Sequence, residues 1–183
     1  MAWLLSLCRA TMLLLAAALL ASCASIRLVP AYDEQIDAGL TTLYGDTSAF
    51  VERMIESAGT PVGSYDANRS FYDSADARVA ALVVRAEAHR VLKDCPSPAI
   101  ITRALDNAQI PAEVRGAIGS LPRDDCQVVL MRLIGTGFQT MRKIHELRGA
   151  RGLPPEARDQ FLTGGVGAQL RAAITVEIAK RAR

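Results

Sequence analysis

Apolar and polar positions along most of this chain alternate with the period of an α-helix. The clearest case begins near Tyr32 or Asp33 and ends near Ser57, where apolar residues follow a 4-3-4-3-4 spacing. The residues of this seam are Ile36, Leu40, Leu43, Thr47, Phe50 and Met54, widened by Val51 and Ile55. Because positions three and four apart share one face of a helix, the spacing predicts a long amphipathic helix with one buried face.

The same spacing recurs in later segments, which we also expect to be helical. The longest span about 71–92, 124–148 and 155–182, and a shorter one spans about 98–108. Residues 59–70 contain the turn-forming types Gly, Pro, Ser, Asp and Asn and are predicted to be a loop. The expected inward residues are Tyr72, Ala75, Val79, Leu82, Ala86 and His89, then Val129, Leu130, Leu133, Ile134, Met141 and Ile144, and finally Phe161, Leu162, Val166, Leu170, Ile174 and Ile178.

Glycine interrupts three of these helical segments. Gly39 and Gly45 lie inside the first, and Gly135 and Gly137 lie inside the segment 124–148. Since glycine costs about 1 kcal/mol relative to alanine inside a helix, we expect neighbouring helices to approach closely at these positions. The run 163–167 holds three glycines and is predicted to kink or divide the last helix.

These segments predict an all-α fold, an antiparallel helical bundle of four main helices plus a short one. No segment has the strict alternation or the turn residues typical of a β-hairpin. The bundle would occupy residues 32–183 of the 183-residue chain as a single domain, which is long enough to bury a core.

The first 22 residues differ in composition, because they form an apolar run with Arg9 as the only charge. The apolar stretch from Ala10 to Ala21 is shorter than the roughly 20 residues that a helix needs to span a bilayer. We therefore interpret residues 1–22 as a cleaved signal peptide and residues 23–31 as a short tether. An uncleaved helix is the alternative.

The end of this run, Leu20-Ala21-Ser22-Cys23, resembles the lipobox of bacterial lipoproteins position for position. The resemblance implies transfer of diacylglycerol to the Cys23 thiol, cleavage before Cys23, and acylation of the new amino terminus with a fatty acid such as palmitate. Three acyl chains anchor a protein stably, since each buried methylene contributes about 0.8 kcal/mol. Ala24 follows Cys23, and the family's sorting rule then favours the outer membrane of a Gram-negative cell, on its periplasmic side. An ordinary signal peptide with a chance cysteine is the other interpretation.

Cys95 and Cys126 are the two cysteines that remain once Cys8 leaves with the signal peptide and Cys23 is lipidated. Export would place them in an oxidising compartment, where disulfides form and persist. We predict a Cys95–Cys126 disulfide, which would close a loop of about 31 residues and stabilise the fold by about 3–4 kcal/mol. The alternative is two free thiols or half a metal site, for which the chain offers no CxxC pair.

The mature chain is nearly neutral, with 20 basic and 19 acidic residues once Arg9 is removed, so the overall charge gives no argument for nucleic acid as a partner. The charges are unevenly distributed. From Arg132 onward there are 10 basic and 4 acidic residues, a net charge of +6, which leaves the rest of the mature chain near −5. Either these charges form solvated helix faces, or the basic half faces anionic lipid headgroups or an acidic partner.

The chain holds two histidines, His89 and His145, and neither belongs to a recognisable catalytic or metal motif. His89 falls on the expected inward seam of its helix, and His145 is expected to be exposed. The cluster Gly164-Gly165-Val166-Gly167 lacks the Lys-Ser/Thr pair of a phosphate-binding loop. The sequence therefore predicts no catalytic residue, no metal ligand and no cofactor.

Tyr32-Asp33-x-x-Ile36-Asp37 follows Cys23 by nine residues and resembles the opening of small, uncharacterised helical lipoproteins of the bacterial envelope. The resemblance implies location and a helical fold, and no activity. We expect a membrane-anchored, non-enzymatic adaptor or scaffold that contacts lipid through acylated Cys23 and binds an envelope protein. The alternatives are a carrier or sensor with an apolar ligand between its helices, and an enzyme of unrecognised type with a pocket around His89.

Overall fold

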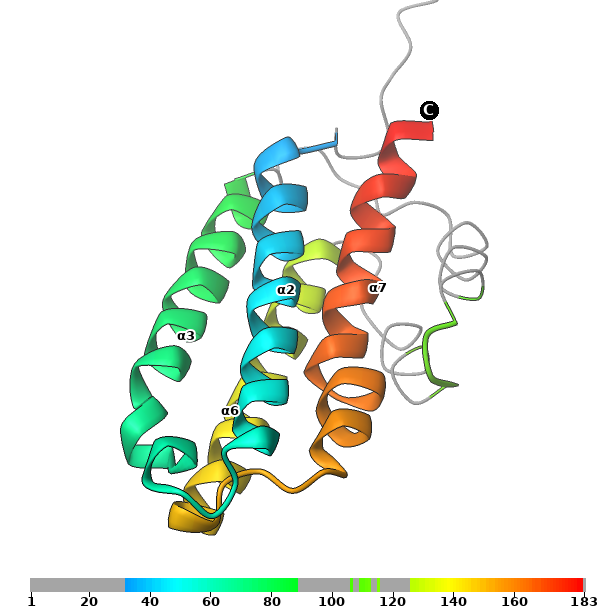
Figure 1. Ribbon diagram of the computed structural model, residues 1–183. Coiled ribbons are helices and arrows are strands. Elements are labelled where there is room, and N and C mark those ends of the chain that lie inside the picture. Colours follow the sequence, from blue (N-terminus) through cyan, green and yellow to red (C-terminus); the bar gives the residue numbers. More distant parts are fainter. Residues whose placement is uncertain (1–31, 89–105, 107–108, 113–114, 116–125, 183) are drawn as a thin grey trace, which may run out of the picture.

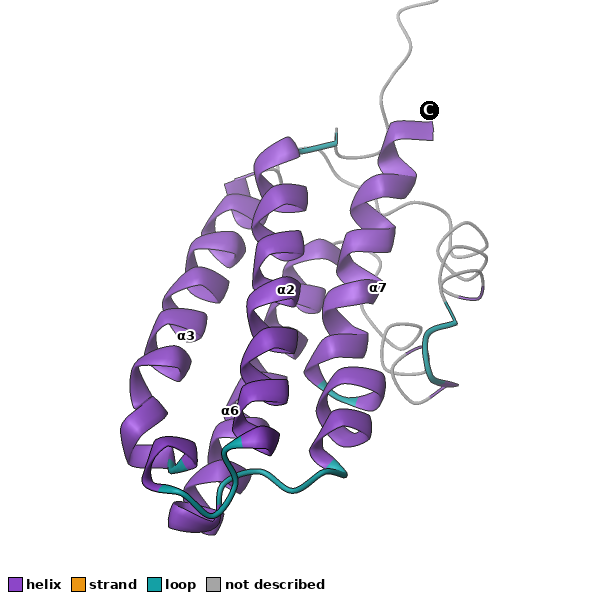
Figure 2. Cartoon of the chain, viewed as in Figure 1, coloured by secondary structure: helices purple, strands orange, loops and turns teal. Residues whose placement is uncertain are grey.

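A computed structural model of the chain describes residues 32–88, 106, 109–112, 115 and 126–182 (Figure 1). All regular structure in these residues is helical, which confirms the all-α prediction for this part of the chain (Figure 2). The long helices are α2 (Glu34–Glu56), α3 (Tyr65–Ala88), α6 (Cys126–Arg148) and α7 (Val166–Ala179). Shorter turns are η1 (Pro61–Gly63), η3 (Gly149–Arg151), the π-helical η4 (Arg158–Gly164) and η5 (Lys180–Ala182).

The long helices form an antiparallel bundle in which α2 packs against α3 and α7, and α6 packs against the same two helices (Figure 1). The start of α2 and the end of α7 therefore lie at one end of the bundle, which we call the N-terminal end. The turns η1 and η3 lie at the opposite end, which we call the distal end. The expected short helix over 98–108 falls outside the described residues.

Helix α2 begins where the sequence predicts, because Asp33 caps it. The Asp33 Oδ1 atom accepts hydrogen bonds from the backbone N–H groups of Gln35 (2.8 Å) and Ile36 (3.2 Å), two of the donors that a helix start leaves without partners. The whole predicted seam from Ile36 to Met54 is buried. The predicted inward positions of α3 that the structure describes, from Tyr72 to Ala86, are buried as well.

Helix α3 begins at Tyr65, six residues before the predicted start, so the expected loop over 59–70 is wrong in its second half. Ser64 and Asn68 explain the difference. The Ser64 hydroxyl accepts from the Ala67 N–H (3.4 Å), and the Asn68 side-chain amide donates to the carbonyls of Val62 (2.6 Å) and Ser64 (2.8 Å). Ser and Asn favour turns, but here these two residues form the cap at the start of a helix.

The predicted division of the last segment is confirmed, because η4 ends at Gly164 and α7 begins at Val166. A Cβ atom on Gly167 would lie 2.4 Å from the Leu162 carbonyl oxygen, so only glycine fits where the two pieces meet. Of the expected inward residues in this segment, Ile178 is instead 47% exposed. Ala173, Val176 and Glu177 are buried near it.

Close helix packing explains some of the other glycines. A Cβ atom on Gly39 would lie 2.9 Å from Leu82 of α3, and one on Gly137 would lie 3.0 Å from the Val166 Cβ of α7. Gly135 is in ordinary contact range of its neighbour, and Gly45 is exposed with no atom within 4 Å of such a Cβ, so close approach is wrong there. The tight glycines are filled contacts between helices and leave no slot for a ligand.

Candidate functional site

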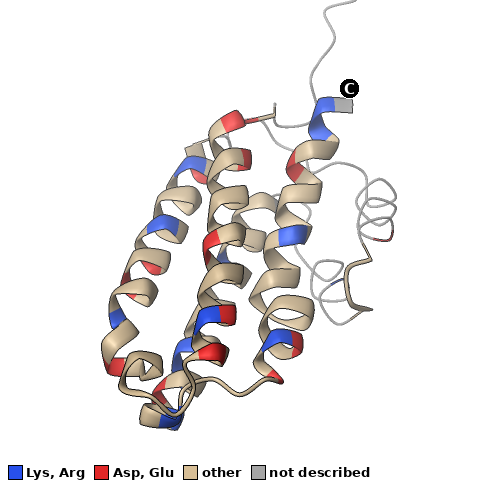
Figure 3. Ribbon diagram, in the orientation of Figure 1, with Lys and Arg blue, Asp and Glu red and all other residues tan. Residues whose placement is uncertain are grey.

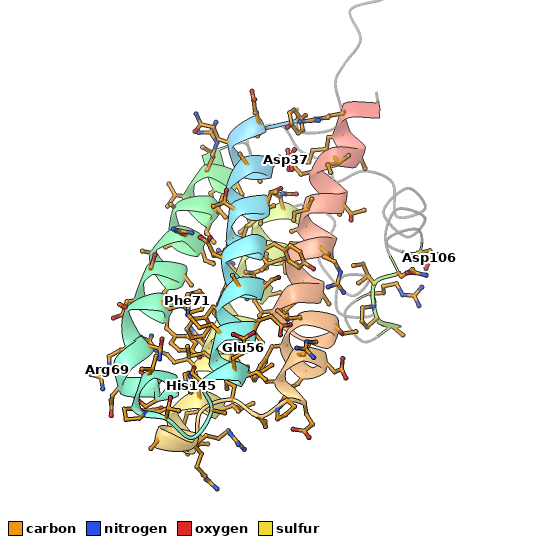
Figure 4. All side chains as sticks on the ribbon, viewed as in Figure 1. Asp37, Glu56, Arg69, Phe71, Asp106 and His145 are labelled. Carbon is orange, nitrogen blue, oxygen red and sulfur yellow. The ribbon has the colours of Figure 1, made fainter. Side chains whose placement is uncertain are left out.

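A cleft of about 320 Å³ lies between α2 and α3. Its walls are one face of each helix, with Leu43, Asp46, Ala49 and Arg53 on α2 opposite Asn68, Ser70, Phe71, Ser74, Ala75 and Arg78 on α3. We call it the α2/α3 cleft. Phe71 is half-buried in this region (Figure 4).

Small side chains keep this cleft open. Ala49 stands at the middle of the α2 wall, and Ser74 and Ala75 stand at the middle of the α3 wall. With one heavy atom beyond Cα on each alanine and two on the serine, these residues cannot fill the space between two helix axes that normally lie 8–10 Å apart. The larger residues Leu43 and Phe71 supply its apolar surface.

The two ends of the cleft differ in charge. At the end nearer the N-terminus of α2, Asp46 and Arg78 form an ion pair that joins the two helices. At the other end, Arg53 forms no ion pair with any residue that the structure describes, and its guanidinium lies 5.7 Å from the centre of the Phe50 ring. The cleft therefore offers one uncompensated positive charge beside an aromatic surface.

Behind the cleft, aromatic rings hold Phe71 in place. Its ring stacks on that of Phe50 with centroids 3.7 Å apart and planes 2° from parallel, and it meets the Tyr72 ring edge-on at 5.4 Å. Such pairs contribute about 0.5–1.5 kcal/mol beyond their buried area. Tyr65 and His145 complete this aromatic cluster.

His145 is fully buried in that cluster, and the prediction that it is exposed is wrong. Its Nε2 lies 2.9 Å from the Gly63 carbonyl oxygen, and its Nδ1 lies 2.9 Å from the Tyr72 hydroxyl. A carbonyl oxygen can only accept, so Nε2 carries the proton, and Nδ1 of the neutral ring accepts from the Tyr72 O–H. The histidine thereby joins α6, α3 and η1 at the distal end.

The environment favours the neutral form of this pair. Burial lowers the pKa of His145, and the nearby Arg148 charge acts in the same direction, although the hydrogen bond to Gly63 opposes them. Burial also raises the pKa of the Tyr72 hydroxyl. Both groups are thus neutral at physiological pH, which suits a structural hydrogen bond and leaves neither poised for proton transfer.

At the N-terminal end, a network of charged groups joins three helices. Glu177 of α7 is fully buried and accepts hydrogen bonds from the Asp33 backbone N–H (2.7 Å) and from Lys180 Nζ (2.6 Å), whose side chain is only 4% exposed. The Asp33 carboxylate, while capping α2, also pairs with Arg85 Nε of α3 at 2.6 Å. We call Asp33, Arg85, Glu177 and Lys180 the charged clamp.

Next to the charged clamp, Tyr32 and Asp37 contact the end of α7. The Arg181 guanidinium lies over the Tyr32 ring, 4.0 Å from its centroid, and donates to Asp37 at 3.2 Å. The Tyr32 hydroxyl also donates to Asp37 at 2.8 Å. With Asp33 in the clamp and Ile36 in the core, all four residues of the Tyr-Asp-x-x-Ile-Asp motif therefore have a structural role.

Figure 3 shows where basic and acidic residues lie along the helices, and several basic residues of the C-terminal half form ion pairs with acidic residues of the N-terminal half. Arg142 of α6 bonds Asp76 (2.9 Å) and Asp73 of α3, and η4 is tied to α2 through Arg158 and Glu52 (2.6 Å). Basic residues of the C-terminal half thus face acidic residues of the N-terminal half. That the basic half also faces anionic lipid or an acidic partner remains a prediction.

Several predicted site residues fall outside the described residues, namely Cys23, Cys95 and His89. Cys126 is the first residue of α6, but its side chain is not among the described parts, so the disulfide remains a prediction. Among the residues that the structure describes, no group of three or more His, Cys, Asp or Glu side chains is arranged to hold a metal ion. Within the same residues, no helix combines the length and the apolar content needed to cross a membrane.

The sequence interpretation did not identify the cleft or the charged clamp, although each had a signal. Small residues, Ala49 on one helix and Ser70, Ser74 and Ala75 on the next, lie where the two helices face each other across the cleft. Glu177 lies four residues after Ala173, at a helical spacing where a buried residue is expected, and a buried carboxylate requires a charged or hydrogen-bonding partner. Comparison of the chain with protein-family models, with curated proteins and with solved structures finds no match.

Proposed function

We propose that this protein is a lipid-anchored adaptor of the bacterial envelope, a non-enzymatic helical bundle held on the periplasmic side of a membrane by acylated Cys23. Ala24 favours the outer membrane if the cell is Gram-negative. The proposal combines the lipobox with the rigid attachment of the first described residues, Tyr32 and Asp33, to the rest of the bundle.

The charged clamp is the observation on which this proposal depends. It fixes the start of α2 to α3 and α7 through buried or partly buried polar contacts, so a pull on the tether acts on the whole bundle and does not peel off α2. Cys23 precedes Tyr32 by nine residues, which reach about 30 Å when fully extended. An anchored bundle is therefore held near the membrane by its N-terminal end.

In this proposal the distal end of the bundle points away from the membrane. Helix α2 has 23 residues, so the bundle is about 35 Å long. The two end networks and the tight glycine contacts make the bundle a rigid spacer, which suits a protein that presents a binding surface to a partner. The glycine contacts give the competing carrier interpretation no support.

Membrane fractionation of cells that express the full chain tests the anchor. We expect Cys23→Ser to release the domain from membranes or to leave an unprocessed precursor. Cys8→Ser, a change outside both the lipobox and the predicted disulfide, is the matched control, which should stay in the membrane fraction as mature protein. Mature, membrane-bound Cys23→Ser protein would contradict the anchor. Cross-linking in intact cells should capture a partner with the wild-type chain, and failure to capture any would contradict the adaptor role.

A further inference from the structure

The α2/α3 cleft combines features that recognise a specific kind of ligand. Phe71 lines it, and stacking on Phe50 with ring centroids 3.7 Å apart holds this ring in place. Arg53 also lines the cleft and forms no ion pair with any residue that the structure describes. Ser70 and Ser74 line the α3 wall. A ligand that carries an apolar group beside an anionic group would complement Phe71 and Arg53.

The dimensions of the cleft limit the ligand to a small segment. Asp46 and Arg53 are the two charged residues on its α2 wall, and the seven residues of helix from one to the other rise about 10 Å. An extended peptide advances about 3.3 Å per residue, so about three residues span that distance. A volume of about 320 Å³ also lies at the lower end of the range for ligand pockets.

The charges define which end of the ligand lies where. Arg78 is already paired with Asp46, so the free guanidinium at the distal side of the cleft belongs to Arg53. A guanidinium binds a carboxylate with two parallel hydrogen bonds, which gives orientation as well as affinity. A neutral apolar ligand would leave the Arg53 guanidinium without a partner.

We infer that the α2/α3 cleft binds about three residues of an extended peptide from a partner protein, with a carboxylate on Arg53 and an aliphatic side chain against Phe71. The carboxylate is either the C-terminus of that partner or an Asp or Glu side chain. The inference rests on the adaptor proposal only in taking the ligand to be part of a partner protein.

Nuclear magnetic resonance titration of the full mature chain in detergent micelles tests this site. The probes are acetyl-Ala-Ala-Leu with a free carboxylate, its C-terminal amide, and acetyl-Glu-Ala-Leu amide. We expect the resonances of Arg53 Nε–H and Phe71 to shift with one or both carboxylate probes and not with the neutral amide. The first probe reports a C-terminal carboxylate and the third a side-chain carboxylate, so the two together identify the source.

Two variants make the test specific. Arg53→Gln should weaken binding of the carboxylate probe at least about tenfold, because it removes a charge-assisted hydrogen bond. Ala49→Leu should abolish binding by filling the middle of the cleft. Arg151→Gln, which removes an exposed arginine at the distal end, is the matched control and should bind like the wild type.

Equal binding by Arg53→Gln and the wild type, equal binding of the neutral amide, or no shift with either carboxylate probe would overturn the inference. These outcomes are independent of the anchor, because the titration uses protein already extracted from the membrane. Failure here with normal release of the Cys23→Ser protein would refute the peptide site and leave the anchor standing.

Discussion

The two ends of this bundle hold their helices together with different chemistry. At the N-terminal end, α2, α3 and α7 are joined by the charged clamp around buried Glu177. At the distal end, α3, α6 and η1 are joined by neutral groups, with His145 between Tyr72 and Gly63 inside an aromatic cluster. Figure 4 shows Asp37 near the first end and His145 and Phe71 toward the second. Because one network is charged and the other is neutral, the two ends should respond differently to substitution and to pH.

The largest effect is expected at Glu177. Glu177→Ala would leave the Lys180 ammonium buried without a counter-charge, and removing one partner of a buried ion pair costs about 3–5 kcal/mol. We expect the free energy of unfolding, measured by urea denaturation, to fall by that amount. Glu156→Ala removes an exposed carboxylate near the distal end and is the control. A loss below about 1 kcal/mol at Glu177 would show that the clamp does not hold this end.

A smaller loss is expected for His145→Ala. The substitution leaves the Tyr72 hydroxyl and the Gly63 carbonyl buried without partners, which costs about 1–3 kcal/mol, and adds a cavity. Tyr72→Phe removes one of the two hydrogen bonds and should cost less. Combining both changes should cost less than the sum of the two, because they share one interaction. Additive losses would contradict the hydrogen bond that joins the two side chains.

Acidification should lower the stability of the protein through His145 at the distal end. The folded pKa of His145 is lowered, so below the unfolded value of about 6.5 the unfolded chain binds the extra proton first. Stability is therefore fully present above that pH and falls as the pH drops below it. His145→Gln should remove this fall between pH 6.5 and 5 in urea unfolding curves. A wild-type stability that stays flat through this window would be inconsistent with a buried neutral histidine.

The smallest effect is expected for Arg181→Gln. Arg181 is largely exposed beside Asp37 and Tyr32, and exposed ion pairs contribute about 0–1 kcal/mol. Thermal unfolding should shift by a few degrees at most, and added salt should remove the difference between variant and wild type. A loss as large as that for Glu177→Ala would mean that the exposed contacts, and not the buried ones, fasten this end.

The helical spacing of apolar residues predicted the buried face of a helix wherever that face consists of apolar core residues. The seam of α2 and that of α3 are correct because apolar residues line one face at regular spacing. It failed for His145, although Ile134, Phe138 and Met141 lead to it by steps of four, three and four residues. The polar side chain of histidine favours an exposed position, whereas the spacing favours a buried one. The histidine is buried because both of its nitrogens find hydrogen-bond partners.

The expectation for Ile178 failed for a geometric reason. It was reached from Leu170 by two steps of four residues, and each such step turns 40° further around a helix of 3.6 residues per turn. Ile178 has therefore rotated to the exposed side, and the inward position belongs to Glu177. Spacing within one helix can mark Glu177 as buried, but it does not say which side chains of other helices it meets, and both the cleft and the clamp depend on such meetings.

The central claim is that the N-terminal end faces the membrane and the distal end points away. Trp3 is the only tryptophan of the sequence and lies in the predicted signal peptide, so in the predicted mature chain single-tryptophan variants report one position each. Ile178→Trp and Val62→Trp replace exposed residues at the N-terminal and distal ends, respectively. In lipidated protein on vesicles with dansyl-labelled headgroups, we predict strong energy transfer from Trp at position 178 and weak transfer from position 62. Equal transfer, or stronger transfer from position 62, would contradict the account.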